Sequence, residues 1–301
     1  MIEIRHVYKN YDDFEALRDI SAEISEKQVF GLIGTNGSGK STLLRIVAGI
    51  LRADQGEVYA DGKRIFEDPG VKKDIFYISD DQYYFSNACP LDIMEYFRIM
   101  YPLFDADRAR KMFEEFELPV KRNVNNFSKG MKKQLSIILG LSSGCRYLLC
   151  DETFDGLDPQ MRQVVKSLFA IDMEEKGLTP VIASHNLREL EDICDHVGLL
   201  HRGGILFSKD LDEMKLGIHK VQLVFGDGEE NPETLFSDLE IMKKEQRGKL
   251  YTLTVRGTKE DTEEKIRAAG PLFYELLPLS LEEIFISETE VNGYDIRKLL
   301  L

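Results

Sequence analysis

Tryptophan is absent from the 301-residue sequence and cysteine is scarce: the four cysteines form no Cys-x-x-Cys pair. A zinc ribbon or a dithiol redox motif needs such closely spaced cysteines, so neither is indicated. No stretch approaches the roughly 20 uninterrupted apolar residues of a membrane-spanning helix. The first residues, MIEIRHVYKNY, alternate like a β-strand and lack a basic segment followed by an apolar one, so no secretory signal is indicated. We therefore expect a soluble, cytoplasmic protein.

Basic residues are in deficit, with 39 Lys and Arg against 53 Asp and Glu and a net charge of −14. Non-specific binding to nucleic acid depends on neutralising phosphates with Lys and Arg. A strongly acidic protein repels that polyanion, so we expect no nucleic-acid partner. Apolar residues, by contrast, make up 43% of the chain, which is enough to build a packed core.

Two zones follow each other along the chain. Over residues 1–215, strand-like and helix-like patterns alternate with glycine-rich punctuation, which is typical of an α/β domain. Between residues 85 and 127 the pattern is almost purely helical and predicts a helical subdomain. Residues 216–301 predict a small α+β domain in the β-α-β-β-α-β order of ferredoxin-like folds, with its first helix near Pro232–Leu239. This second zone carries no recognisable chemistry, so dimerisation and regulation both remain open as its role.

A glycine-rich segment, Gly34-Thr35-Asn36-Gly37-Ser38-Gly39-Lys40-Ser41-Thr42, joins a strand pattern to an apolar-periodic helix pattern and satisfies G-x-x-x-x-G-K-[ST]. In such a loop, backbone N–H groups surround the β-phosphate and the helix N-terminus adds its positive end. Lys40 is expected to reach the β- and γ-phosphates, and the Ser41 hydroxyl to ligate Mg²⁺. We therefore predict that a nucleotide is bound by Gly34, Asn36, Gly37, Ser38, Gly39, Lys40, Ser41 and Thr42.

Two adjacent carboxylates, Asp151 and Glu152, follow the buried strand pattern Tyr147–Cys150. Downstream of a phosphate loop, the first is expected to hold Mg²⁺, directly or through water. The second is expected to orient or deprotonate the attacking water. Two acids with different tasks fit hydrolysis better than phosphoryl transfer to a bound alcohol, so we predict an ATP hydrolase.

Two further segments flank this strand: Phe127-Ser128-Lys129-Gly130-Met131 precedes it, and Phe154-Asp155-Gly156-Leu157-Asp158-Pro159 follows it. With the phosphate loop, and in this order, they resemble the nucleotide-binding subunits of ABC transporters over residues 2–215. The resemblance implies a P-loop NTPase fold of the ABC type and a head-to-tail dimer that sandwiches two ATP molecules. In that dimer Ser128 and Gly130 would meet the γ-phosphate held by the other subunit, and Asp158 would bridge the subunits.

The same resemblance covers single residues. His185, which ends the strand pattern Pro180–Ala183, matches the family's switch histidine, which contacts the γ-phosphate and helps position Glu152. Tyr11 matches the aromatic ring that stacks on adenine, and Tyr8 is the competing aromatic residue.

One position departs from the family pattern. Asp80 follows Tyr77-Ile78-Ser79, where the family usually has glutamine, and Gln82 comes two residues later. A carboxylate at this position could still ligate Mg²⁺ or its water. The effect of the exchange on γ-phosphate sensing stays open.

The resemblance also implies partners: a polytopic membrane permease encoded separately, and a second ATP-binding subunit, identical or related. The chain would then lie peripherally on the inner face of the cell membrane, with ATP and Mg²⁺ as cofactors. The aromatic segment Gln82–Ser86 would grip a short helix of the permease, and the C-terminal zone resembles the tails of exporter subunits, which favours export over import. The alternative is a soluble ABC-type ATPase without a membrane partner. Substrate contacts in this family lie in the permease, so the sequence does not reveal the transported substrate.

Overall fold

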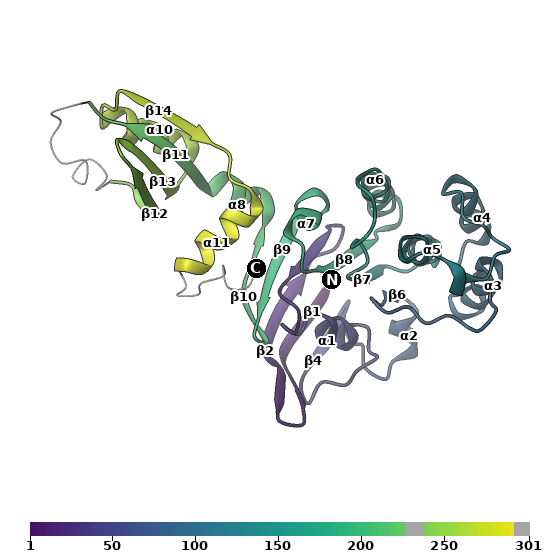
Figure 1. Ribbon diagram of the computed structural model, residues 1–301. Helices are drawn as coiled ribbons and strands as arrows, with labels where there is room; N and C mark the ends of the chain where they lie inside the picture. The colour runs from purple at the N-terminus through teal and green to yellow at the C-terminus, as the bar shows by residue number, and fades with distance from the viewer. Residues whose placement is uncertain (227–237, 292–301) are drawn as a thin grey trace. The chain divides into compact units, whose positions relative to one another are not determined.

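The computed structural model describes residues 1–226 and 238–291. The chain forms two compact units, Met1–Ser208 and Lys209–Leu301, which we describe separately (Figure 1). The division falls after Ser208 rather than after the predicted residue 215, because the helix α8 (Leu211–Gly217) packs against strand β11 (Ile218–Val224) of the second unit.

A six-stranded sheet forms the centre of the first unit. Its order is β10 (Gly204–Asp210), β9 (His196–His201), β3 (Phe30–Ile33), β8 (Thr179–Ser184), β7 (Tyr147–Asp151) and β6 (Ile75–Ile78). From β9 to β6 the neighbouring strands are parallel. Every residue of β3, β7 and β8 is buried, as expected for strands covered on both faces. The carboxyl ends of these three strands therefore meet at one edge of the sheet.

A second sheet is antiparallel, in the order β2 (Phe14–Ile24), β1 (Ile2–Tyr11), β4 (Gln55–Ala60) and β5 (Lys63–Arg64). Helix α1 (Lys40–Val47) contacts β2 of this sheet as well as β7 and β8 of the first. Its apolar face, Leu43, Leu44, Ile46 and Val47, is buried in one core with residues of both sheets. This packing fixes the N-terminus of α1 at the edge where β3, β7 and β8 end.

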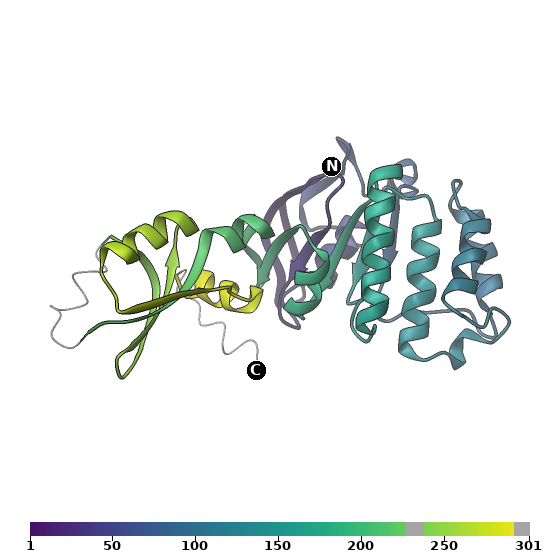
Figure 2. The same ribbon diagram turned by 90° about the horizontal axis from the view of Figure 1, so that it is seen from above.

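The remaining helices of the first unit are α2 (Pro69–Lys72), α3 (Pro90–Met100), α4 (Ala106–Glu115), the 3-10 turn η1 (Val124–Asn126), α5 (Lys129–Ser142), α6 (Pro159–Lys176) and α7 (Leu187–Ile193). Helices α3, α4 and α5 pack side by side, as Figure 2 shows. Helix α5 also packs on β6, so this helical layer is tied to the edge of the central sheet.

The second unit contains α8, then β11, β12 (Glu240–Arg247), β13 (Leu250–Arg256), α10 (Lys259–Ala268), β14 (Phe273–Leu277) and α11 (Leu281–Val291). The sheet order is β12-β13-β11-β14, and all neighbours are antiparallel. A β-α-β-β-α-β unit gives this order. The first helix of that unit was predicted at Pro232–Leu239, largely within residues 227–237, which lie outside the described residues; the ferredoxin-like arrangement as a whole stays a prediction.

Candidate active site

The glycine-rich loop between β3 and α1 closes around the ammonium group of Lys40. This side chain is 5% exposed, and its Nζ donates to the carbonyl oxygens of Gly34 at 2.7 Å and Thr35 at 3.2 Å. Gly39 has a φ of 108°, and a Cβ there would lie 2.6 Å from the carbonyl oxygen of Ala16. The left-handed backbone and the close approach both require glycine at this position. The loop thus presents its backbone and Lys40 at the N-terminus of α1.

Asp151, at the end of β7, is held by two hydroxyl groups. Ser41 Oγ donates to its Oδ1 at 3.0 Å, and Tyr77 Oη donates to its Oδ2 at 2.9 Å. Burial raises the pKa of the Asp151 carboxyl above its usual range, while these two hydrogen bonds act in the opposite direction. A buried carboxylate beside a serine hydroxyl offers the oxygen donors that Mg²⁺ prefers.

Glu152 meets both Lys40 and His185. Its Oε1 lies 3.2 Å from Lys40 Nζ, and its Oε2 lies 2.8 Å from His185 Nδ1 and accepts from the His185 backbone N–H at 3.3 Å. The backbone of Glu152 has a φ of 47°, which is uncommon for a residue other than glycine and is typical of constrained sites. The structure therefore brings together the three residues that the sequence proposed for catalysis, from the ends of β3, β7 and β8.

The loop that carries His185 is fixed from behind by a buried carboxylate. Ser184 Oγ donates to Glu189 Oε2 at 3.1 Å, and Asn186 Nδ2 donates to Glu189 Oε1 at 3.2 Å. Burial raises the pKa of the Glu189 carboxyl. The sequence analysis missed Glu189, because an acidic residue in the first turn of a helix such as α7 more often faces solvent.

A cavity of about 230 Å³ connects this cluster to the aromatic segment at the end of β1. Of the residues that the sequence predicted to bind nucleotide or metal, its lining includes Tyr11, Asn36, Gly37, Gly39, Lys40, Ser41, Thr42, Asp80 and Glu152. Phe14, which the sequence analysis did not single out, lines the cavity as well, and Tyr8 does not. Ser38, although part of the loop, is buried and lies outside the lining.

A second cavity of about 350 Å³ lies beside the N-terminal end of α5 and is lined by Asp80, Asp81, Gln82, Lys129, Lys132, Lys133 and Asp155. Gln82, the other residue considered for the position of the family's glutamine, lines this cavity and not the first one. Asp80 lines both. Asp80 is therefore the residue of this pair that reaches the cavity of the phosphate loop.

The residues predicted to act on the other subunit's nucleotide do not join the cluster. Ser128 is exposed and caps α5, accepting from the Met131 backbone N–H at 3.2 Å. Asp158 is exposed and caps α6, accepting from the Met161 backbone N–H at 2.8 Å. Gly130 lies in the first turn of α5 and, like the other two, is not part of the lining of the 230 Å³ cavity.

Lys133 is a residue of this region that sequence reasoning missed. Its side chain is 6% exposed, and its Nζ donates to the carbonyl oxygens of Glu152 at 2.5 Å and Asp155 at 2.7 Å. Buried lysines need such partners, because burial otherwise disfavours their charge. The sequence shows only a second lysine in the pair Lys132–Lys133. In the fold, Lys133 therefore links α5 to the backbone at both ends of residues 152–155, the segment that follows β7.

Within residues 1–226 and 238–291, no group of three or more His, Cys, Asp or Glu side chains is placed to hold a metal ion. The donor set around Asp151 would therefore have to be completed by a hydroxyl group, a ligand or water. Nor does any helix in the described part of the chain have the length and apolar character needed to cross a membrane.

Comparison with known proteins decides the family. The ABC transporter family matches residues 17–155. The chain is 32% identical, over 288 residues, to the ABC transporter ATP-binding protein YtrB of Bacillus subtilis (strain 168), which covers 96% of this chain and 98% of that protein. The chain belongs to the ABC transporter ATP-binding proteins. ATP binding is a property of this family. In this ABC protein the family's motifs are the phosphate loop and the carboxylates at the strand end.

Other ABC relatives differ in what their names say they transport. The lantibiotic transport ATP-binding protein SrtF of Streptococcus pyogenes is 28% identical over 250 residues, 81% of this chain and 99% of that protein. The methionine import ATP-binding protein MetN of Clostridioides difficile is 29% identical over 230 residues, 72% of this chain and 70% of that protein.

A solved structure shares the fold. The dimeric structure of a post-hydrolysis state of the ATP-binding cassette MJ0796, bound to ADP and Pi, superposes with a TM-score of 0.64 at 21% identity. The match covers 70% of this chain and 99% of that one. The predicted fold class, a P-loop NTPase of the ABC type, is confirmed.

Proposed function

We propose that this ABC protein binds Mg-ATP in the 230 Å³ cavity and hydrolyses it to power a separate membrane permease. The observation that carries the hydrolysis is the placement of Glu152, with one carboxylate oxygen 3.2 Å from Lys40 and the other 2.8 Å from His185. A carboxylate fixed on both sides, at the mouth of a phosphate loop, is placed to accept a proton from a water molecule that attacks the γ-phosphate.

The chain's own residues divide the work of the reaction. Lys40 exchanges its contacts with the carbonyls of Gly34 and Thr35 for phosphate oxygens, and stabilises the charge that develops there. His185 holds Glu152 by its ring and its backbone N–H, and so orients the base. Ser41, Asp151 and Asp80 would hold Mg²⁺, which would supply positive charge against the phosphates.

The adenine ring is expected against Tyr11. Tyr11 is 42% exposed and lines the same cavity as the phosphate loop. Phe14, 58% exposed, lies in that lining and can extend the stacking surface.

We infer that the site is completed by a second copy of the chain or a related subunit. Ser128 and Gly130 stand at the N-terminus of α5, where backbone N–H groups favour an anion. Both lie outside the chain's own phosphate-loop cavity, which supports a role on the nucleotide of a partner. Asp158 would bridge the two subunits, and the cassette that shares this fold is itself dimeric, which supports pairing of two chains.

Exposed apolar side chains between residues 83 and 103 support a permease partner. Tyr83 is 86% exposed, and Phe85, Ile99 and Leu103 are also exposed. Tyr84 is different, because its hydroxyl contacts Ser136 Oγ at 2.7 Å and it is largely buried. We therefore assign docking to Tyr83 and Phe85, at the inner face of the membrane. Co-purification of a polytopic protein from native membranes, lost in the Tyr83→Ala, Phe85→Ala chain, is the expected result; capture that the double substitution leaves unchanged would contradict it.

The direction of transport rests on two similarities. The C-terminal zone resembles the tails of exporter subunits, and LptB of Haemophilus influenzae, whose name denotes lipopolysaccharide export, is matched over 89% of its length. MetN, whose name denotes import, is matched over 70% of its length. We therefore propose export, and ATP-dependent loss of a substrate from cells that carry the permease is the result expected.

The substitution Glu152→Gln tests the hydrolysis. It keeps the size of the side chain and removes its basicity, so turnover of Mg-ATP is expected to fall about 10²–10⁴-fold, while ATP affinity stays within about twofold. Glu175→Gln, on an exposed position of α6, is the matched control and is expected to leave turnover unchanged. Full turnover in the Glu152→Gln chain would contradict the proposal.

A further inference from the structure

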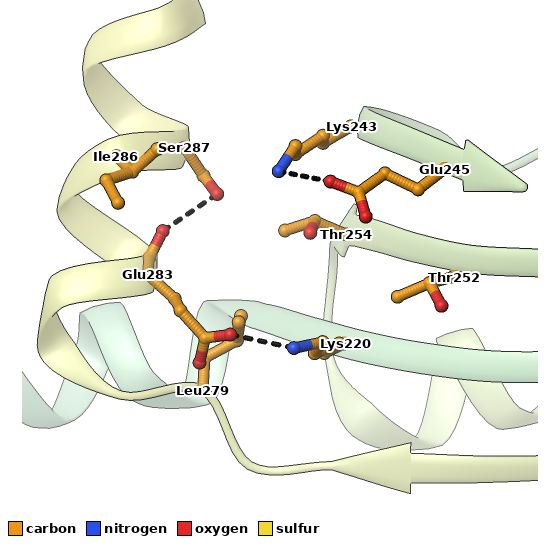
Figure 3. Close-up of a pocket in the computed structure, with 9 residues that line it drawn as sticks. All are labelled: Lys220, Lys243, Glu245, Thr252, Thr254, Leu279, Glu283, Ile286 and Ser287. Atoms are coloured by element: carbon orange, nitrogen blue, oxygen red, sulfur yellow. Dashed lines mark hydrogen bonds and ion pairs between the residues drawn. The ribbon is translucent and has the colours of Figure 1, made fainter. Parts of the chain in front are cut away.

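The second unit contains a polar cavity of about 90 Å³ between its sheet and α11 (Figure 3). Its lining consists of Lys220, Lys243, Glu245, Thr252, Thr254, Leu279, Glu283, Ile286 and Ser287. None of these residues belongs to the candidate active site.

The strand register explains why polar side chains gather here. Thr254 on β13 is paired with Lys220 on β11 and with Lys243 on β12, so the three residues form one row across the sheet. Successive residues of a strand face opposite sides. The alternate positions Val221, Leu253 and Val255 are buried in the apolar core with Ile266 of α10. The sheet therefore has one apolar face and one polar face, and α11 closes over part of the polar one.

The two lysines that line this cavity have more N–H donors than their carboxylate partners accept. Lys220 Nζ lies 2.7 Å from Glu283 Oε1, and Lys243 Nζ lies 2.6 Å from Glu245 Oε1. An ammonium group has three N–H donors, so each lysine retains two after meeting its carboxylate. Figure 3 shows the two ammonium groups on either side of Thr254.

Thr254 adds a second feature. It is 7% exposed and lines the cavity, in the same row of the sheet as the two lysines. An occupant of the cavity that accepts hydrogen bonds would meet this hydroxyl and both lysines together.

We propose that this cavity is a binding site for a small oxyanion, such as phosphate or a short carboxylate. An oxyanion offers only acceptors, which is what a hydroxyl flanked by two ammonium groups requires. The volume of about 90 Å³ suits a ligand of this small size. Glu245 and Glu283 hold the two lysines in place and set the affinity by their opposing charge.

The test is isothermal titration calorimetry of the full chain with sodium phosphate and, separately, sodium acetate, with chloride keeping the ionic strength constant. The chain carries Lys40→Ala, so that the phosphate loop does not report the same anion. A dissociation constant of about 1 mM or tighter is expected for at least one of the two anions. If both fail to bind at tens of millimolar, the site is overturned.

Four variants locate the binding. Thr254→Val and Lys220→Met are expected to weaken it roughly tenfold, because each removes a donor. Glu283→Gln breaks the same ion pair as Lys220→Met but leaves the ammonium, so it is expected to strengthen binding. Thr262→Val is the matched control, since Thr262 is also a buried threonine but lies outside the lining.

Lys220→Met is expected to weaken binding and Glu283→Gln to strengthen it. These opposite effects distinguish a ligand site from an ion pair that only stabilises the fold. If Lys220→Met and Glu283→Gln weaken binding equally, the pair acts only through the stability of the unit and the proposal fails. If all four variants bind as the parent chain does, the anion binds elsewhere and the proposal also fails.

Discussion

The two halves of the proposed ATP site differ in how firmly their own chain holds them. The strand-edge cluster, formed by Lys40, Ser41, Asp151, Glu152 and His185, is linked by contacts of 2.8–3.2 Å between residues far apart in sequence. The signature turn, Ser128 to Gly130, makes one side-chain hydrogen bond, to the start of its own helix. The strand-edge cluster is therefore preorganised inside one chain. The signature turn, by contrast, presents backbone donors to solvent.

This difference fits the proposed site shared between two chains. Electrostatic groups act best when their geometry is fixed before the reaction, as in the strand-edge cluster. A turn that lies outside its own cavity contributes only when a partner brings a phosphate to it. Lys133 links the halves, because it lies on the helix of the signature turn and donates to the carbonyl oxygen of Glu152.

Among substitutions outside the strand-edge cluster, removal of this link is expected to reduce turnover the most. Lys133→Met leaves the carbonyls of Glu152 and Asp155 without their buried donor, at a cost of roughly 1–3 kcal/mol each. We expect kcat to fall about 10–100-fold with KM nearly unchanged, because Glu152 loses its position and the phosphate loop keeps its own. Steady-state kinetics at several ATP concentrations check this.

Two companions make the Lys133 result specific. Lys133→Arg retains a donor and is expected to recover part of the lost kcat. Lys111→Met, on an exposed position of α4, is expected to behave like the parent chain. If KM rises and kcat does not fall, Lys133 does not position Glu152 and the halves are linked in another way.

A change of opposite sign in stability and in activity is expected at Asp151. Burial raises the pKa of this carboxyl, so the folded state binds the proton more tightly than the unfolded state. Ionised Asp151 therefore costs stability, and the cost grows as pH rises from the ordinary value of 3.8 through the raised pKa. Without Mg-ATP at pH 7, Asp151→Asn is expected to raise Tm by a few degrees while turnover is lost.

Thermal unfolding at several pH values tests the sign. The gain in Tm is expected to shrink as pH falls through the raised pKa and then below 3.8, where the carboxyl is neutral in both states. Asp13→Asn, at an exposed turn, is the control and is expected to leave Tm unchanged. A lower Tm for Asp151→Asn at pH 7 would mean that Ser41 and Tyr77 stabilise the charge more than burial opposes it.

The strand-edge cluster could be predicted from sequence because each part is a local pattern. The glycine run, the strand ending in Asp151 and Glu152, and the strand ending before His185 are each read within about ten residues. The parallel sheet then brings their ends together. Asp80 was placed by the same reasoning, and it lines the cavity of the phosphate loop.

Contacts that depend on the packing of distant segments were not predictable. Lys133 donates to backbone carbonyl oxygens 19 and 22 residues away. Because every residue has a carbonyl oxygen, the sequence does not indicate which one a lysine contacts. Strand β2 was missed, because Phe14–Ile24 shifts its register against β1 and its alternation is broken. The burial of Tyr84 beside exposed Tyr83 likewise depends on where α5 packs, which the sequence pattern did not define.

The measurement that tests the shared site most directly is ATP-dependent dimerisation. Sedimentation velocity of the Glu152→Gln chain with Mg-ATP is expected to show a dimer, because ATP is bound and not consumed. Adding Ser128→Asp keeps a residue that caps α5 but sets a negative charge where the partner's γ-phosphate would lie. The expected result for this double variant is a monomer that still binds ATP. A dimer that persists with Asp at this position, with ATP bound, would contradict it.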